Sequence, residues 1–214
     1  MKVLAAAFLG LFGLLAAAPG ALAQGSVRNF DFYVLALSWS PSFCALEGRE
    51  KGRDQCDGAP KGFVLHGLWP QHERGYPANC EHPARNAPDS LIRSIRGLYP
   101  EDGLARHQWR KHGTCAGVSP SEYFSEVKRA RDKVALPAGL DQAEEGGRLR
   151  TRDIERAFME ANPGLRPGML AVTCVRGMLQ EVRVCLSKDL RSFTACPDVV
   201  RSGCRAQEVS APTR

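Results

Sequence analysis

The side chains best suited to chemistry are concentrated in the segment HQWRKHGTC, which begins at His107. If this segment is helical, successive residues turn by about 100°, and one side of the helix carries two imidazoles, an amide and an ammonium group. These groups belong to His107, Gln108, Lys111 and His112. Trp109 points away from them, which favours a place in the core, and Gly113 can end the helix. Because imidazole exchanges protons near neutral pH, this side predicts acid–base chemistry beside a fixed cation.

A third histidine of interest lies in the segment GFVLHGLWPQH. His66 stands near the end of an apolar run, and Trp69 offers a flat ring on which a nucleobase can stack. A general base, a general acid and a cation are sufficient to cleave RNA without a metal. The base takes the proton of the ribose 2′-OH, the oxygen attacks phosphorus, and the acid protonates the leaving 5′-oxygen. DNA lacks the 2′-OH and cannot react in this way.

Two other interpretations of these histidines compete with catalysis. A single histidine on a strand is more often a hydrogen-bonded structural residue, but two segments that each combine His with Trp favour catalysis. A metal site is disfavoured because His107 and His112 are five positions apart, and because Lys111 would repel a cation. The sequence therefore predicts no metal and no cofactor. His72 and His82, in a segment rich in Pro and Gly, are predicted to lie on the surface.

The N-terminus has the pattern of a secretory signal peptide over residues 1–23. A lysine precedes a long apolar run, and Ala21-Leu22-Ala23 forms a small-x-small cleavage site. An uncleaved membrane anchor is the alternative, and the Gly and Pro within the run disfavour it. No later segment is long and apolar enough to span a bilayer. Cleavage would leave residues 24–214 as one secreted or periplasmic domain with no membrane contact.

The cysteines and the charge fit a secreted protein with an anionic partner. All eight cysteines follow the signal peptide, and an even number in a secreted chain implies disulfides. No CxxC pair typical of zinc sites occurs, and spacing alone leaves about 105 possible pairings. The formal net charge of +6, with Arg more frequent than Lys, suits nucleic acid, although solubility alone would also account for it.

Strand patterns flank the histidine segments. Apolar and aromatic runs predict strands over residues 30–39 and 62–70, the second closed by Pro70, with a polar loop between them. Two further runs, MLAVTCV and LQEVRVCLS, predict a hairpin around the turn Arg176-Gly177-Met178. The last ten or so residues have the composition of a tail.

Three more helices are predicted from their starting signals. Ser119 and Glu122 form a capping box that opens the longest of them. Asp89 can cap a short helix, and Thr151 can cap one that stops before Pro163. Strands, then helices, then strands, with short connections, favour a single α+β domain with a mainly antiparallel sheet.

The two histidine segments together resemble the ribonuclease T2 family of secreted, largely base-nonspecific endoribonucleases. HGLWPQH is similar to the family's first active-site segment, HGLWP, and HQWRKHGTC to its second, usually HEWxKHGTC. FYVLALSWSPSFC resembles the family's first strand, and the resemblance extends from Phe30 to Cys204. It implies an α+β fold with a cleft over an antiparallel sheet, an RNA substrate and no cofactor. The expected products are a 2′,3′-cyclic phosphate and then a 3′-phosphate.

The resemblance also implies a role for each residue of the site. The catalytic residues would be His66 as general acid, His112 as general base, His107 as phosphate ligand and Lys111 as the cation on the transition state. The substrate-binding residues would be Trp69, Gln71 and Tyr76. Two positions depart from the family, because Gln108 replaces a glutamate and Gln71 replaces an aspartate that helps to read the base. Base preference therefore does not follow.

The resemblance further implies a monomer with four disulfides, which would be Cys44–Cys56, Cys80–Cys115, Cys174–Cys204 and Cys185–Cys196. Two rival functions are left at this stage. One is a secreted RNA-binding or signalling protein of the same fold, for which Gln108 is the only argument. The other is a metal-dependent phosphodiesterase.

Overall fold

The structure is a computed structural model that describes residues 28–48, 54–57, 62–140 and 147–212. The predicted signal peptide lies outside these residues. Within them, no helix has the length and apolar character needed to cross a membrane.

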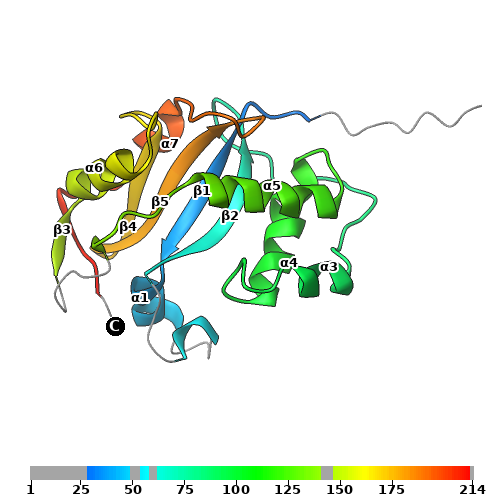
Figure 1. Ribbon diagram of the computed structural model, residues 1–214, viewed down its shortest axis with the longest axis horizontal. Helices are drawn as coiled ribbons and strands as arrows, with labels where there is room; N and C mark the ends of the chain where they lie inside the picture. Colours follow the sequence, from blue (N-terminus) through cyan, green and yellow to red (C-terminus); the bar gives the residue numbers. More distant parts are fainter. Residues whose placement is uncertain (1–27, 49–53, 58–61, 141–146, 213–214) are drawn as a thin grey trace, which may run out of the picture.

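A six-stranded sheet forms the centre of the domain (Figure 1). Its strands are β1 (Phe32–Trp39), β2 (Phe63–Gln71), β3 (Arg148–Arg150), β4 (Leu170–Val175), β5 (Met178–Ser187) and β6 (Glu208–Ser210). The order is β2-β1-β5-β6-β3, with β4 paired to β5. All pairings are antiparallel except the short one between β5 and β6. The predicted single α+β domain with a mainly antiparallel sheet is therefore confirmed.

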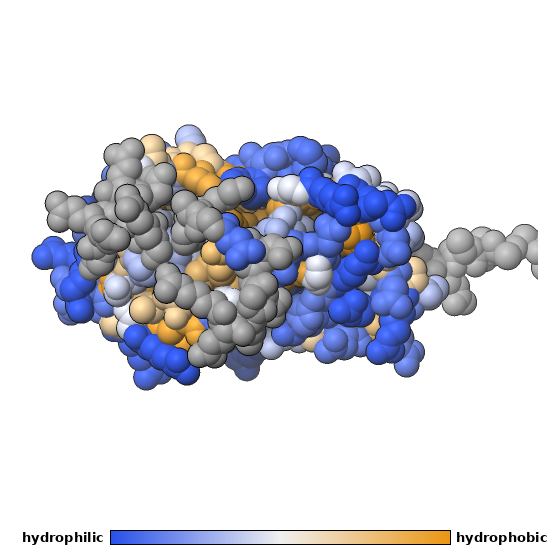
Figure 2. Space-filling model, turned by 90° about the horizontal axis from the view of Figure 1, so that it is seen from below, coloured by the Kyte–Doolittle hydropathy of each residue, from blue (hydrophilic) through white to orange (hydrophobic). Residues whose placement is uncertain are grey.

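Helices cover the sheet and its β2 side. They are α1 (Ser40–Phe43), α3 (Asp89–Ser94), α4 (Asp102–Lys111), α5 (Pro120–Lys133), α6 (Thr151–Ala161) and α7 (Pro197–Arg201). Helix α5 crosses the sheet, whereas α3 and α4 stand beyond β2 on the right of Figure 1. Seen from below, the end of the molecule over α3 and α4 is mainly hydrophilic (Figure 2).

The apolar run of β1 is explained by burial on both of its faces. Tyr33, Leu35 and Leu37 belong to the main core, which also contains apolar side chains of α5 and α6. Phe32 and Val34 alternate with them and join a smaller cluster on the opposite face. Because side chains alternate along a strand, a strand buried on both faces reads as a continuous hydrophobic run. The second face is the one over which the site is built.

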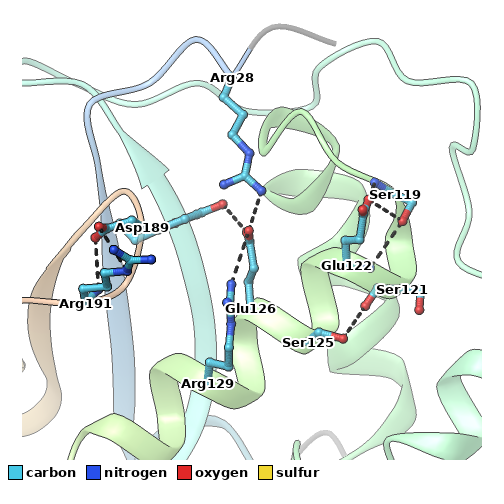
Figure 3. Close-up of polar contacts among 10 residues, drawn as sticks. Arg28, Ser119, Ser121, Glu122, Ser125, Glu126, Arg129, Asp189 and Arg191 are labelled. Carbon is cyan, nitrogen blue, oxygen red and sulfur yellow. Dashed lines mark hydrogen bonds and ion pairs between the residues drawn. The ribbon is translucent and has the colours of Figure 1, made fainter. Parts of the chain in front are cut away.

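An ion pair and a hydrogen bond of Glu126 hold α5 against the start of the described chain, and a capping box begins the helix (Figure 3). The buried carboxylate of Glu126 pairs with Arg28 and accepts a hydrogen bond from the Tyr33 hydroxyl at 2.7 Å. At the start of the helix, Ser119 Oγ accepts the Glu122 N–H, and the Glu122 carboxylate accepts the Ser119 N–H at 2.9 Å. The predicted capping box is thus confirmed.

The other two predicted caps are wrong. Asp89 is the first residue inside α3, and its carboxylate accepts a hydrogen bond from Arg106 at 2.7 Å. Thr151 is the first residue inside α6, and its hydroxyl donates to the carbonyl oxygen of Ala206 at 3.2 Å. In both cases a tertiary partner takes the side chain that local sequence would assign to the helix end.

Two further predictions, for the turn of the hairpin and for the last ten or so residues, differ from the structure. The turn of the β4–β5 hairpin contains only Arg176 and Gly177, with φ of 50° and 77°, while Met178 pairs with Val175 in the sheet. A two-residue turn of this hand matches the twist of its strands. Within the expected tail, β6 (Glu208–Ser210) pairs with β3 and buries Val209, so this part of it belongs to the sheet.

Four disulfides link the described chain, in the pairing that the family resemblance implies: Cys44–Cys56, Cys80–Cys115, Cys174–Cys204 and Cys185–Cys196. The second joins the loop after β2 to the turn that follows α4. It therefore connects the two segments that carry the histidines.

Candidate active site

A β-bulge in β2 places His66. Ala36 pairs with Gly67 and Leu37 with Leu65, so His66 is an extra residue with no partner on β1. Leu65 lies in the main core, whereas the His66 side chain is about one-third exposed and turns to the opposite face of the sheet. A bulge re-aims a side chain in this way without breaking the strand.

The strand also continues past the predicted end. Pro70 pairs with Tyr33, and β2 runs on to Gln71. Pro70 has no N–H to donate to a neighbouring strand. It is tolerated here because β2 is at the edge of the sheet. The extension adds Gln71, whose side chain joins those of His66 and Trp69 in lining one hollow beside α4.

Helix α4 presents the second histidine segment. Trp109 is fully buried, as predicted, and its Nε1 donates to the carbonyl oxygen of Ala84 at 3.0 Å. The helix ends at Lys111, and His112 leaves it with φ of −120°. The prediction that Gly113 ends the helix is wrong. Glycine is needed there because a Cβ would approach Trp109 Cε3 to 2.4 Å and Tyr123 to 2.9 Å.

Trp69 lies at the centre of the site. Its ring stacks on His112, with 5.2 Å between centroids and an angle of 27°, and meets the His66 ring edge-on at 5.2 Å. Its Nε1 donates to Gln108 Oε1 at 2.8 Å, and Gln108 is buried. Gly67 leaves room for this contact, since a Cβ there would lie 2.2 Å from Gln108 Oε1. Trp69 therefore fixes the relative positions of the two histidines.

Two residues of β5 that the sequence analysis did not single out complete the site. The buried carboxylate of Glu181 is hydrogen-bonded to His66 Nδ1. Arg183 donates to the same carboxylate at 3.0 Å, and its guanidinium lies 5.2 Å from the centroid of the Trp69 ring. Their signal in the sequence is a charged pair at alternate positions of an otherwise apolar run, LQEVRVCLS.

The surroundings of these groups set their charges. Burial alone would raise the pKa of Glu181, but the hydrogen bond and charge of His66, together with Arg183, lower it to about 2. The carboxylate is therefore ionised, and His66 Nδ1 donates the hydrogen bond. For His112, burial and then the positive charges of Lys111, His66 and His107 lower the pKa to about 3. His112 is thus a neutral imidazole at neutral pH.

The pKa of His107 is also lowered, by burial first and then by the charges of Lys111 and Arg110. The side chain belongs to α4 and reaches the cleft beside Lys111. A neutral histidine can donate a hydrogen bond to an anionic oxygen, and it does not repel the ammonium group of the neighbouring Lys111.

The cleft has two halves that meet at the histidines. A hollow of about 410 Å³ is lined by Trp69, Gln71, Tyr76, Lys111, His112 and Arg183, among others. A second hollow of about 420 Å³ extends the other way past Ser38 and Glu101. His66, His107, Gln180 and Glu181 border both. The structure thus brings together all eight residues predicted for the site.

The remaining histidines lie elsewhere. His82 is half-buried, bonds the carbonyl oxygen of Val118 at 3.1 Å and packs edge-on against Trp109, so its predicted surface position is wrong. His72 lies 3.9 Å from Asp31, away from the other histidines. Among the described residues, no three His, Cys, Asp or Glu side chains gather as metal ligands would.

Comparison with known proteins gives one consistent result. A model of the ribonuclease T2 family matches residues 30–196. A ribonuclease from Aeromonas hydrophila is 36% identical over 180 residues, which cover 82% of this chain and 80% of the relative. Ribonuclease 1 from Arabidopsis thaliana is 27% identical over 97% of both chains.

Solved structures show the same fold. The RNase-related protein from Calystegia sepium matches with a TM-score of 0.68 at 21% identity, covering 86% of this chain and 97% of its own. RNase NT in complex with 5′-AMP matches with a TM-score of 0.58 at 22% identity, covering 86% and 98%.

Fold, site and relatives together define the class of this protein, which is an endoribonuclease. More particularly, the chain belongs to the ribonuclease T2 family, as its two histidine segments predicted.

Proposed function

We propose that the cleft cleaves single-stranded RNA by acid–base catalysis between His66 and His112, without a metal ion. The observation that carries this proposal is the contrast between the two imidazoles around Trp69. His66 is held by the ionised carboxylate of Glu181, whereas His112 is buried beside positively charged groups. Paired titratable groups whose environments differ in this way are suited to act as acid and base.

In the first step, neutral His112 takes the proton of the ribose 2′-OH. The 2′-oxygen then attacks phosphorus, the bond from phosphorus to the 5′-oxygen breaks, and protonated His66 gives its proton to the leaving oxygen. The product is a 2′,3′-cyclic phosphate. In the second step the roles reverse, and a water molecule activated by His66 opens the ring to a 3′-phosphate.

His107 and Lys111 are suited to hold the phosphoryl group. They are four positions apart on α4, so their side chains are neighbours, and both border the hollow that contains His112. The ammonium group of Lys111 would stabilise the charge that gathers on the phosphoryl oxygens. Gln108 would act through Trp69, by holding its ring against His112.

The nucleobase would occupy the hollow next to Trp69. Tyr76 is exposed at 57% and its ring lies 6.3 Å from that of His112, so it offers a free face for stacking. Gln71 lines the same hollow and supplies both a hydrogen-bond donor and an acceptor.

We further propose that residues 1–23 direct secretion and that residues 24–214 act as a monomer in the periplasm or outside the cell. Four disulfides support an oxidising compartment. Mass spectrometry of the exported protein should find Gln24 as its first residue, and size-exclusion chromatography with light scattering should give the mass of one chain.

One assay tests the proposed reaction. The purified mature protein is incubated with RNA, with DNA of the same sequence, and with RNA plus EDTA, and the product ends are identified. We expect RNA alone to be cut, in the presence or absence of EDTA, with cyclic phosphate appearing before 3′-phosphate. Cleavage of DNA, loss of activity in EDTA, or binding of RNA without cleavage would each contradict the proposal.

A further inference from the structure

A third hollow, of about 310 Å³, lies beside α4 and does not include Trp69 in its lining, and we call it the basic groove. It is lined by Asn79, Cys80, Glu81, His82, Arg85, His107, Arg110, Lys111 and Thr114. Two of these residues, His107 and Lys111, also border the hollow that contains His112. The basic groove therefore adjoins the proposed catalytic centre, with these two side chains between them.

The spacing of the lining residues along α4 explains why the basic groove adjoins the proposed catalytic centre. Arg110 and Lys111 follow His107 by three and four residues, and Thr114 follows them by four and three, which places all four on one stripe of α4 and the turn after it. Neighbours on such a stripe are about 5–6 Å apart at Cβ. A chain held at its phosphate by His107 and Lys111 therefore meets Arg110 without leaving the surface of the helix.

The cations of the basic groove are available to a ligand. Among the ion pairs of the described residues, none involves Arg85, Arg110 or Lys111, whereas Arg106, one turn earlier on the same helix, is bound to Asp89 at 2.7 Å. One carboxylate, Glu81, lines the groove, so positive charge is in excess there.

The walls of the basic groove are fixed. The disulfide Cys80–Cys115 holds the segment that carries Asn79 and Glu81 against the end of α4. The N–H of Asn79 also donates to the carbonyl oxygen of Lys111 at 2.8 Å. The hydroxyl of Thr114 donates a hydrogen bond to the carbonyl oxygen of Arg110 at 3.0 Å. The charged donors of the groove are the side chains of Arg85, Arg110 and Lys111.

We propose that the basic groove binds the phosphodiester next to the one that is cleaved, through Arg110 and Arg85. The planar guanidinium group suits this ligand because it can donate two parallel hydrogen bonds to a phosphate. The enzyme would then cleave RNA chains of several nucleotides more efficiently than dinucleotides. This inference rests on the proposed ribonuclease site and extends it to the substrate backbone.

The test compares kcat/KM for a dinucleotide and for an octanucleotide of RNA at low salt. Arg110→Ala and Arg85→Ala should each lower the ratio of octanucleotide to dinucleotide cleavage by about fivefold, as for a charge-assisted contact at a partly exposed site. Arg110→Lys should recover part of the loss. Trinucleotides with a single cleavable ribose, extended from the dinucleotide by one nucleotide on the 5′ or on the 3′ side, identify which neighbouring phosphate occupies the groove.

Arg152→Ala is the matched control for net charge. Arg152 is exposed on α6, at the opposite end of the molecule from α4 in Figure 1. This variant should leave the ratio unchanged. If it lowers the ratio as much as Arg110→Ala does, general charge attraction explains the preference and the groove has no part in it. Glu81→Gln should change the ratio in the opposite direction, since it removes the carboxylate from the groove.

A binding measurement provides a second readout. The affinity for a 2′-O-methyl octanucleotide, which cannot be cleaved by 2′-OH attack, is measured against salt concentration. Each lost phosphate contact should make the logarithmic slope shallower by about 0.7. A wild-type enzyme that cleaves neither substrate would contradict the proposed function itself. Normal dinucleotide cleavage with an unchanged ratio and slope in both arginine variants would contradict the groove alone.

Discussion

The ionised carboxylate of Glu181 accepts a hydrogen bond from His66 Nδ1, across 115 positions of the sequence. Arg183 and the Ser38 hydroxyl occupy the rest of the carboxylate, at 3.0 and 3.3 Å. The Nδ1 atom of His66 is therefore committed to the protein, and Nε2 is the atom left to exchange protons with a substrate. In the proposed mechanism Glu181 is a positioning residue for the acid.

Glu181→Gln tests this role, because it keeps the shape of the side chain and removes its charge. We expect kcat/KM to fall by about 10–100-fold, as when an outer partner of a catalytic group is lost. Glu181→Asp keeps the charge but shortens the side chain, so it should recover only part of the loss if the hydrogen bond to His66 Nδ1 positions the imidazole. A fall in kcat/KM that matches the loss of folded protein, measured by circular dichroism of the same samples, would mean that Glu181 acts only on folding.

The same carboxylate should make the enzyme sensitive to acid. The pKa of Glu181 is lowered to about 2 from its ordinary 4.5, so ionised Glu181 stabilises the folded state above about pH 4.5. This contribution is lost as the pH falls from about 4.5 toward 2. Urea unfolding at pH 7 and at pH 3 should therefore show a smaller difference for Glu181→Gln than for the wild type.

The lowered pKa of His112 predicts activity at acidic pH. A base must be neutral to accept a proton, and His112 stays neutral down to about pH 3. We expect the acid limb of kcat/KM to lie below about pH 5. His66→Ala and His112→Ala should each lower kcat by about 10²–10⁴-fold, whereas His72→Ala, outside the cleft, should not. An acid limb near pH 6.5 would show that His112 is not the base.

Local sequence was enough to name the candidate histidines, but not to place His66 against the others or to find Glu181. His107 to His112 could be placed because the period of one helix fixes which residues share a side. His66 needed a bulge, and Glu181 needed the pairing of β1 with both β2 and β5, which join distant segments. Sequence patterns that describe one element at a time do not contain such pairings.

The errors in the fold have a similar origin. Strand β6 has only three residues, too few for an alternating pattern, and its place depends on β3 and β5. Asp89 and Thr151 have the right types for helix caps, but tertiary partners take their side chains. The Ser119 capping box was predicted correctly because both of its hydrogen bonds lie within four residues.

Gly67 gives a test of the packing between Trp69 and Gln108. A Cβ at this position would lie 2.2 Å from Gln108 Oε1 and 2.5 Å from Trp69 Nε1, so Gly67→Ala must displace one of them. We expect kcat to fall by about 100-fold, the cost of a displacement near 1 Å in a catalytic site. Gly103→Ala is the control, because a Cβ there meets nothing within 4 Å. It should keep full activity and stabilise α4 by about 0.5–1 kcal/mol.

Gln108 is the position at which the catalytic helix departs from its family, and the structure gives this difference a specific setting. Its amide oxygen accepts the Trp69 N–H, and the Trp69 ring stacks on His112. A glutamate at this position can accept the same hydrogen bond, but it brings a negative charge into a buried site. That charge would favour protonated His112 and raise its pKa from about 3.

Gln108→Glu should therefore shift the acid limb of kcat/KM upward by on the order of one pH unit. The measurement is kcat/KM against pH on a dinucleotide at fixed ionic strength. Gln108→Met is the matched control, because it removes the hydrogen bond to Trp69 without adding charge, and it should lower kcat without moving the limb. If Gln108→Glu leaves the acid limb where it lies in the wild type, while Gln108→Met lowers kcat, residue 108 acts through the Trp69 hydrogen bond alone. The choice of glutamine over glutamate would then have no part in setting the working pH of the base.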